Sequence, residues 1–315
     1  MKNILIIFML FSGSLFAQNY IPYYNITNEA VYRLMITKEY EKAEKLYLEA
    51  FKLEKPLISD YYQMARCYAG KGDTINMIKY LKLSSTEVSF NPLLFVNSKR
   101  DSVLFYKYKQ QQSFIACMKE IEKTNENHKT ALKTDKELKI KKDTIAYFLR
   151  VFQQSRKNIL KNMTDLTREQ KDSLRKLADA SDVVLRKSLL EYVEKNGFPE
   201  YTAPGSMLSG SDFVSILLIS MTEEEFDKYN PLMQRELKKG NLMPYDYGYI
   251  IDKVQSRTRG NKCSYFSVNN MNKDCWNQSI EERKKIGLSI YLDGSSQNIL
   301  KGNNKKLPWV GTLVN

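Results

Sequence analysis

Residues able to do acid–base or nucleophilic chemistry are scarce in this chain. Its single histidine, His128, sits in the polar stretch NENHKT, where a histidine is typical of a surface position. Without a second histidine, no serine–histidine or cysteine–histidine dyad can be built elsewhere. The motifs CxxC, HExxH, the P-loop and GxGxxG do not occur. These residue types predict no cofactor and no metal site and favour binding over catalysis, although a serine–lysine pair stays open because lysines occur throughout.

Cys263 and Cys275 enclose the segment CSYFSVNNMNKDC, which could be a disulfide-closed loop, half of a metal site or two unrelated thiols. Zinc takes about four ligands, and the segment offers no histidine and only Asp274 as a charged oxygen ligand. Residues 265–268 have strand character, and the asparagines after them favour a turn. Because paired cysteines usually bridge in an oxidising compartment, an exported chain would carry a Cys263–Cys275 disulfide.

The other two cysteines have different surroundings. Cys67 lies in ARCYA, among small residues that favour close helix packing, and is predicted to be a buried thiol. Cys117 follows on the next long segment with helical periodicity. A Cys67–Cys117 bridge stays open, as does pairing of either one with the later two cysteines.

The first residues, MKNILIIFMLFSGSLFAQN, have the layout of a cleavable secretory signal. Lys2 supplies a positive start, the apolar run from Ile4 to Phe11 is too short to span a bilayer, and the small Ala17 precedes Gln18. No later apolar segment reaches the ~20 residues that a membrane-spanning helix needs. We therefore expect cleavage after Ala17, a secreted or periplasmic location, and no transmembrane segment in the mature chain.

Charge is plentiful but evenly spread. The net charge is +13, carried mostly by lysines mixed with glutamates. Nucleic-acid-binding proteins instead gather arginines in patches with interleaved aromatic residues. The pattern favours a solvated helical surface and predicts no nucleic-acid partner. The expected export would place any protein or peptide partner in the cell envelope.

Two stretches of the N-terminal part match when one is shifted by 34 residues. They are residues 29–56, with the core EYEKAEKLYLEA, and residues 62–85, beginning YQMARCYAGKGD. The paired positions are apolar or small in both copies: Ala30 with Met64, Val31 with Ala65, Leu34 with Tyr68, Ala43 with Met77, Tyr47 with Leu81, and Ala50 with Ser84. This period and pattern resemble the tetratricopeptide repeat, two antiparallel helices per unit. The family's tryptophan is absent here.

The resemblance implies where a partner would bind. In the family's register the inward-facing positions of the first helices fall on Asn28, Tyr32, Met35, Tyr62 and Arg66. The alternative is that these side chains pack on the helices that follow. Gly70, Gly72 and Asp73 mark the turn of the second unit, and FNPLLFV, from residue 90, is expected to cover its open apolar face.

The middle of the chain predicts long helices, because no glycine or proline occurs between Leu104 and Asn196. The polar residues 125–136 are expected to loosen the chain. Thr164, Asp165 and Thr167 each offer an N-cap for the next helix. Carboxylates such as Asp182 are interpreted as part of a solvated helix face. The predicted divisions are a signal peptide at 1–17, repeats at 18–103, a connecting helix at 104–134 and a C-terminal domain at 135–315.

After Gly197 the order of motifs resembles an uncharacterised bacterial domain family with a Gly-Trp-Pro turn, a His-Ala-Asp helix end, an Asp-Arg pair and a Tyr-Gly-Thr segment. Asp252 and Lys253 stand at the Asp-Arg pair, Tyr265 begins the Tyr-Gly-Thr equivalent, and Arg283 precedes the late Gly-Leu. Ser220 and Met221 stand where the family's histidine would be. If the family's polar cluster does chemistry, this chain has lost much of it.

The sequence thus predicts a mainly α protein: a short tetratricopeptide-like repeat followed by a mostly helical domain with a small β element. The favoured function is an exported protein-binding or scaffold module that uses the repeat groove. The alternative is a hydrolase-like enzyme of the cell envelope with a site among Asp252, Lys253, Tyr265 and Arg283. A buried, converging cluster of those four would favour the enzyme.

The predicted disulfide can be tested directly. Peptide mapping of the exported protein under non-reducing conditions should recover Cys263 and Cys275 in one linked peptide. Closing this loop would stabilise the fold by on the order of 3 kcal/mol, so reduction should lower the melting temperature. Free thiols at these two positions, or a bridge from either to Cys67 or Cys117, would contradict the prediction.

Overall fold

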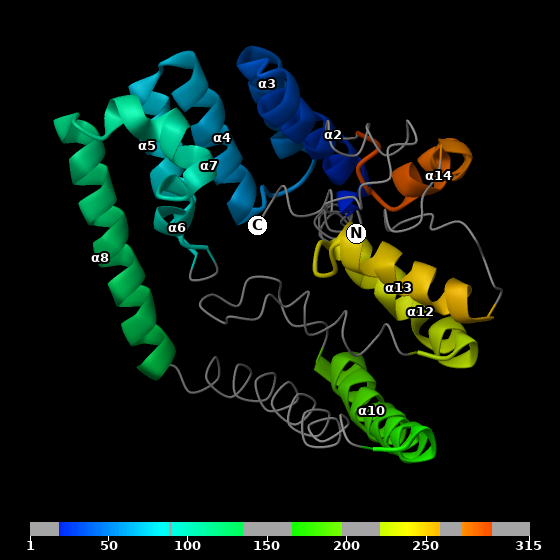
Figure 1. Ribbon diagram of the computed structural model, residues 1–315. Coiled ribbons are helices and arrows are strands. Elements are labelled where there is room, and N and C mark those ends of the chain that lie inside the picture. Colours follow the sequence, from blue (N-terminus) through cyan, green and yellow to red (C-terminus); the bar gives the residue numbers. More distant parts are fainter. Residues whose placement is uncertain (1–18, 88–89, 135–165, 197–220, 259–272, 292–315) are drawn as a thin grey trace, which may run out of the picture.

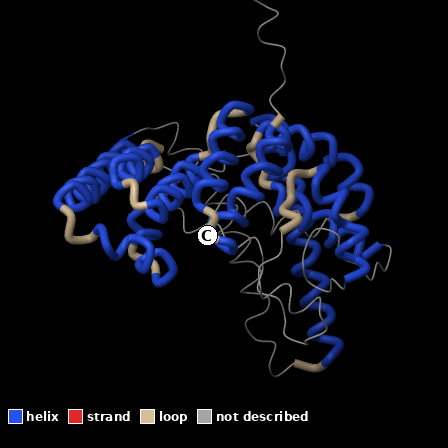
Figure 2. Tube along the Cα trace, turned by 90° about the horizontal axis from the view of Figure 1, so that it is seen from above, coloured by secondary structure: helices blue, strands red, loops and turns tan. Residues whose placement is uncertain are grey.

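A computed structural model describes residues 19–87, 90–134, 166–196, 221–258 and 273–291, and within these ranges all regular structure is helical (Figures 1 and 2). The prediction of a mainly α protein is confirmed. The strand predicted at 265–268 and Cys263 lie outside the described residues. No described helix combines the length and the apolar character needed to cross a lipid bilayer.

The elements follow one another as α2 (Tyr20–Tyr32), η2 (Arg33–Thr37), α3 (Tyr40–Leu53), α4 (Ile58–Lys71), α5 (Thr74–Leu83), α6 (Pro92–Val96), α7 (Lys99–Phe105), η3 (Tyr106–Tyr108), α8 (Gln112–Thr134), α10 (Arg168–Asn196), α12 (Glu223–Lys239), α13 (Pro244–Thr258) and α14 (Lys273–Lys285).

The two matched stretches form two helical hairpins. α2 with η2 packs along α3, α4 packs along α5, and α3 packs against α4, so the hairpins stand side by side (Figure 1). The matched positions are buried in both copies, except that Val31 is half-buried. The 34-residue period therefore marks equivalent core positions of successive hairpins.

The turn between α4 and α5 uses two of the three residues expected there. Gly72 caps α4 with φ +86°, in the left-handed region that favours glycine. Asp73 is the N-cap of α5, and its side chain accepts a hydrogen bond from the Asn76 amide. Gly70 instead lies inside α4, where a side chain would collide with the ring of Tyr40. This glycine lets the two hairpins approach closely and does not shape the turn.

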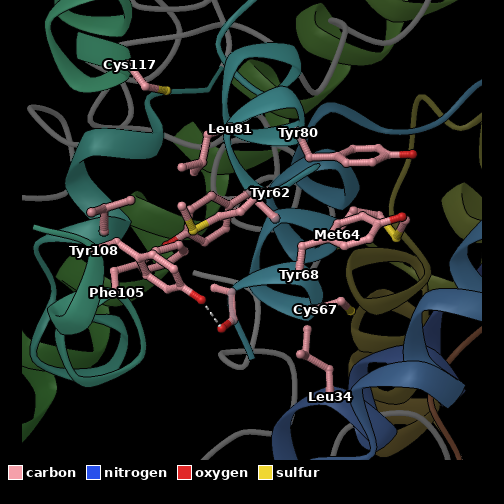
Figure 3. Packing of buried hydrophobic residues seen from close by; sticks show 14 of the residues in the cluster. Leu34, Tyr62, Met64, Cys67, Tyr68, Tyr80, Leu81, Phe105, Tyr108 and Cys117 are labelled. Atoms are coloured by element: carbon pink, nitrogen blue, oxygen red, sulfur yellow. Dashed lines mark hydrogen bonds between the residues drawn. The ribbon is translucent and has the colours of Figure 1, made fainter. Parts of the chain in front are cut away.

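The segment after α5 covers the second hairpin, as predicted. Asn91 caps α6 and Pro92 begins it. Phe90 and Phe95 stack on each other with ring centroids 4.9 Å apart, and each lies 5.6 Å from the ring of Tyr62 in α4. Figure 3 shows the core that this cover closes, including the hydrogen bond from the Tyr108 hydroxyl to the Ala69 carbonyl.

α8 runs unbroken to Thr134, so the expected loosening after residue 125 does not occur up to that point. The stretch contains no glycine or proline, and its polar side chains bond outward to neighbouring elements. The Asn125 amide donates to the Asn91 side-chain oxygen over 2.8 Å, and the His128 ring lies 3.1 Å from the Ser85 carbonyl. These two contacts connect α8 to the residues that follow α5 and to the cap of α6.

Cys67 and Cys117 are both free and buried, on α4 and α8. Burial raises the pKa of the Cys67 thiol to about 12 and that of the Cys117 thiol to about 11. The buried thiol predicted at Cys67 is confirmed, and the two cysteines do not bridge.

The C-terminal helices begin at well-defined caps. Thr167 and Gln170 exchange side-chain and backbone hydrogen bonds at the start of α10, as predicted for Thr167. Thr222 and Glu225 form the same reciprocal capping box at α12. The apolar faces of α10, α12 and α13 then meet in one hydrophobic core.

α2 belongs to two cores. Its first half contributes Tyr20, Tyr23 and Tyr24 to the core built by the C-terminal helices. Its second half contributes Ala30 to the core of the hairpins, and Leu34 of η2 follows in the same core. The predicted repeat and C-terminal domain therefore share a helix.

A buried carboxyl group lies where α2, α3 and α4 meet. Asp60, in the first turn of α4, accepts a 2.6 Å hydrogen bond from the Tyr23 hydroxyl, which itself accepts one from the Leu57 amide. The Tyr47 hydroxyl is buried without a hydrogen-bond partner among the described residues. Burial raises the pKa of Asp60 to about 7, with the Tyr23 hydrogen bond opposing that rise.

Asp60→Asn should change how stability depends on pH. Because the folded-state pKa is raised, the native chain holds the proton more tightly than the unfolded chain, so stability is greatest below pH ~4 and falls as pH rises toward 7. The amide mimics the protonated acid, so above pH 8 the variant should be more stable by roughly 2–4 kcal/mol.

Urea unfolding at pH 5 and pH 8 measures this difference. Asp172→Asn, a change at an exposed carboxylate on α10, is the matched control and should leave the pH profile unaltered. Parallel profiles for wild type and Asp60→Asn would contradict the assignment.

Candidate functional site

The exposed edge of α2 is occupied by another part of the chain. Asn25 and Asn28 donate side-chain hydrogen bonds to the Lys284 and Gly287 carbonyls, over 3.0 and 2.8 Å. The Lys284 carbonyl lies in the last turn of α14, where helix geometry leaves carbonyl groups for outside donors, and Gly287 follows that helix end. Asn28 was predicted as a groove residue; Asn25, three positions earlier on the same helix face, was not.

Aromatic stacking extends this contact. The rings of Tyr32 and Tyr291 stack with centroids 4.9 Å apart and planes 22° from parallel. Burial and a hydrogen bond to Glu29 raise the pKa of the Tyr291 hydroxyl to about 12. We call Asn25, Asn28, Glu29 and Tyr32 the α2 face, and residues 284–291 the clasp segment.

The clasp segment approaches α2 closely because of one glycine. Gly287 has φ +74°, and a Cβ there would lie 2.7 Å from the Tyr24 Cβ. Two residues further on, the clasp segment is bound to its own helix, since the Arg283 guanidinium donates to the Ser289 carbonyl over 2.7 Å. The segment thus lies between α2 and the end of its own helix.

The predicted groove positions on the second hairpin lie in a buried polar cluster. The Tyr62 hydroxyl donates to one carboxylate oxygen of Asp101 over 2.6 Å, and the Arg66 guanidinium pairs with the other over 2.7 Å. The side chains of Arg66 and Asp101 are only 6% and 5% exposed. In this conformation α7 occupies the place where a partner was predicted.

The five groove candidates therefore fall into two groups. Asn28 and Tyr32 contact the clasp segment, while Tyr62 and Arg66 contact Asp101. Met35 is half-buried against the core of the hairpins. Only the first group lies at a surface that holds a length of peptide.

The C-terminal candidates are brought together in part. Asp252 on α13 and Arg283 on α14 are both buried. Burial lowers the pKa of Arg283 to about 10, and the charge of Asp252 opposes that change. Lys253 is half-buried with its ammonium 5.2 Å from the centre of the Tyr249 ring. Tyr265 lies outside the described residues, as do Cys263 and the side chain of Cys275.

Two charged residues of α10 were missed. Asp182, interpreted as solvated, is buried, and so is Arg186, which pairs with Glu225 of α12 over 2.7 Å. The signal was present in the sequence, because both residues share a helical stripe with Leu189 and Val193. A charged residue on such a stripe indicates a buried ion pair.

No known protein identifies the site. No family model, no curated protein and no solved structure matches the chain. Within the described ranges, no group of three histidine, cysteine, aspartate or glutamate side chains is placed to hold a metal ion. The geometry of the α2 face and of the Asp252–Arg283 pair is therefore what a functional proposal can use.

The buried cluster on the second hairpin predicts a large mutational effect. Asp101→Asn leaves the buried Arg66 charge without its carboxylate and should cost about 3–5 kcal/mol of unfolding free energy. Replacing both partners, by Asp101→Leu with Arg66→Met, should recover most of that loss because no buried charge remains. Urea unfolding measures both variants, and an Asp101→Asn chain as stable as wild type would refute the pairing.

Proposed function

We propose that this protein is an exported binding module and that the α2 face is its partner-contacting surface. One observation carries the proposal: the α2 face already holds a length of peptide. Asn25 and Asn28 bind its carbonyl oxygens, and Tyr32 stacks on its aromatic side chain. Side-chain amides that bind backbone carbonyls can recognise a peptide largely independently of its other side chains.

The resemblance to tetratricopeptide repeats supports this surface. The hairpins stand side by side, and the positions matched at 34 residues are buried in both. Membership of that family, a small β element near residue 265 and a disulfide-closed loop between Cys263 and Cys275 remain parts of the proposal. The resemblance of the C-terminal part to the uncharacterised bacterial family is also part of the proposal.

Export is the second part of the proposal. The first 17 residues have the composition of a secretory signal. The partner would then be a protein or peptide of the cell envelope. In the exported product, mass spectrometry should find a chain that begins at Gln18, and a full-length cytoplasmic product would refute this part.

An envelope hydrolase is the other candidate. The specific observation in its favour is the buried, electrostatically coupled pair of Asp252 and Arg283, on two different helices. If this pair is catalytic, ester, peptide or glycosidic chromogenic substrates should be cleaved by the wild type and not by folded Asp252→Asn. Equal rates for the two proteins would remove the pair from the mechanism.

The binding proposal is tested by comparing two double variants. The chain beginning at Gln18 is immobilised and incubated with a detergent extract of the bacterial envelope. Asn28→Ala with Tyr32→Ala should lose the retained partner, because it removes one carbonyl contact and the stacking ring. The matched control is Asn127→Ala with Tyr106→Ala, which changes the same residue types at exposed positions of α8 and η3.

Circular dichroism should first establish that both double variants are folded. The control must retain the partner as the wild type does. A partner retained equally by the α2-face variant would show that binding takes place elsewhere on the chain.

A further inference from the structure

The surface that the proposed function assigns to a partner is filled by the protein itself. The clasp segment makes the contacts expected of a bound peptide, with two carbonyls on asparagine side chains and an aromatic ring stacked on Tyr32. The two asparagine contacts join positions 259 residues apart in the sequence. Chain continuity does not impose this contact. It depends on the asparagine and ring contacts and on Leu288, which packs in the core that contains Tyr24.

The contact is also selective. At Gly287 any side chain would meet Tyr24, and the backbone there is in the left-handed region that favours glycine. Four residues later Tyr291 supplies both the stacked ring and the hydroxyl that bonds to Glu29. The α2 face therefore fits a peptide with a glycine in a left-handed turn and an aromatic residue four positions further on.

We propose that the clasp segment is a built-in ligand that keeps the α2 face closed, so that an external peptide of this glycine–aromatic type binds only by displacing it. The inference rests on the proposed function, because it concerns how that same surface is regulated. An intramolecular ligand acts at an effective concentration in the millimolar range. A short free peptide at micromolar concentration therefore competes poorly, whereas a whole partner protein that makes further contacts can displace the clasp.

The test uses the full chain from Gln18 and a fluorescein-labelled peptide of residues 279–291, SIEERKKIGLSIY. Fluorescence anisotropy compares the wild type with Gly287→Ala, in which the new methyl group pushes the clasp segment away from Tyr24. The variant should bind the peptide at least tenfold more tightly than the wild type. The matched control is Gly72→Ala, which replaces another glycine of positive φ where nothing lies within 4 Å, and it should bind like the wild type.

Two further measurements locate the binding. Adding Asn28→Ala to Gly287→Ala should abolish the gain, and a peptide with alanine in place of its glycine should bind at least tenfold more weakly. Tyr291→Ala, which removes the stacked ring and leaves the backbone unstrained, should also expose the face if Gly287→Ala does not fold.

The outcomes distinguish a failure of the built-in ligand from a failure of the proposed function. Equal peptide binding by wild type and the opened variants, or none by any folded variant, would overturn the built-in ligand. Peptide exchange that depends on Asn28 would support it even if no envelope protein were retained. In that case the proposed function would be contradicted, and the built-in ligand would still be supported.

Discussion

The tyrosines of α2 hold the molecule together, because one short helix serves two hydrophobic cores. Tyr20, Tyr23 and Tyr24 place their rings against the C-terminal helices, and their edge-to-face and tilted packing keeps the ring centroids about 5–6 Å apart. The hydroxyl groups of Tyr20 and Tyr23 reach back toward the hairpins, where Tyr20 donates to the Lys55 carbonyl and Tyr23 to Asp60, while the Tyr24 hydroxyl contacts the Met243 sulfur. An amphipathic aromatic side chain can satisfy both environments, which an aliphatic one could not.

This double role limits where a partner could dock. The inner side of α4 is committed to Asp101 and to the rings of Phe90 and Phe95. The first half of α2 is committed to the C-terminal core. The clasp segment covers the α2 face, which belongs to neither core. The proposed partner surface therefore lies on the helix that joins the two cores.

Much of the hairpin architecture could be predicted because it depends on local spacing. Residues close in sequence set the turn at Gly72 and Asp73 and the caps at Thr167 and Thr222. The 34-residue period repeats the same local spacing in two hairpins. The occupants of the inner faces could not be predicted in the same way. Whether Tyr62 faces a partner or Asp101 depends on how α7 packs, and the contact of Asn28 with Gly287 depends on tertiary structure alone.

The charged residues show a different limit. Asp182 was interpreted from its residue type alone, although its spacing places it with Arg186 on the buried stripe of α10. Asp60 likewise looks like an ordinary first-turn carboxylate, a position that favours negative charge. Burial in the tertiary structure raises its pKa to about 7, although the hydrogen bond from Tyr23 opposes that rise. Residue type predicts solvation only when helix periodicity agrees.

The long separation between α2 and the clasp segment also has a consequence for the order of folding. A ribosome makes the chain from its N-terminus, so α2 exists before any residue of its second core. Contacts between residues 259 positions apart are among the slowest to form, since a long loop must close first. Until the C-terminal helices are complete, Tyr20, Tyr23 and Tyr24 lack the core that buries them and are exposed to solvent and to other chains. Among the described helices, α2 is therefore the one most prone to misassembly during synthesis, because the helices that bury its tyrosines are made after the hairpins.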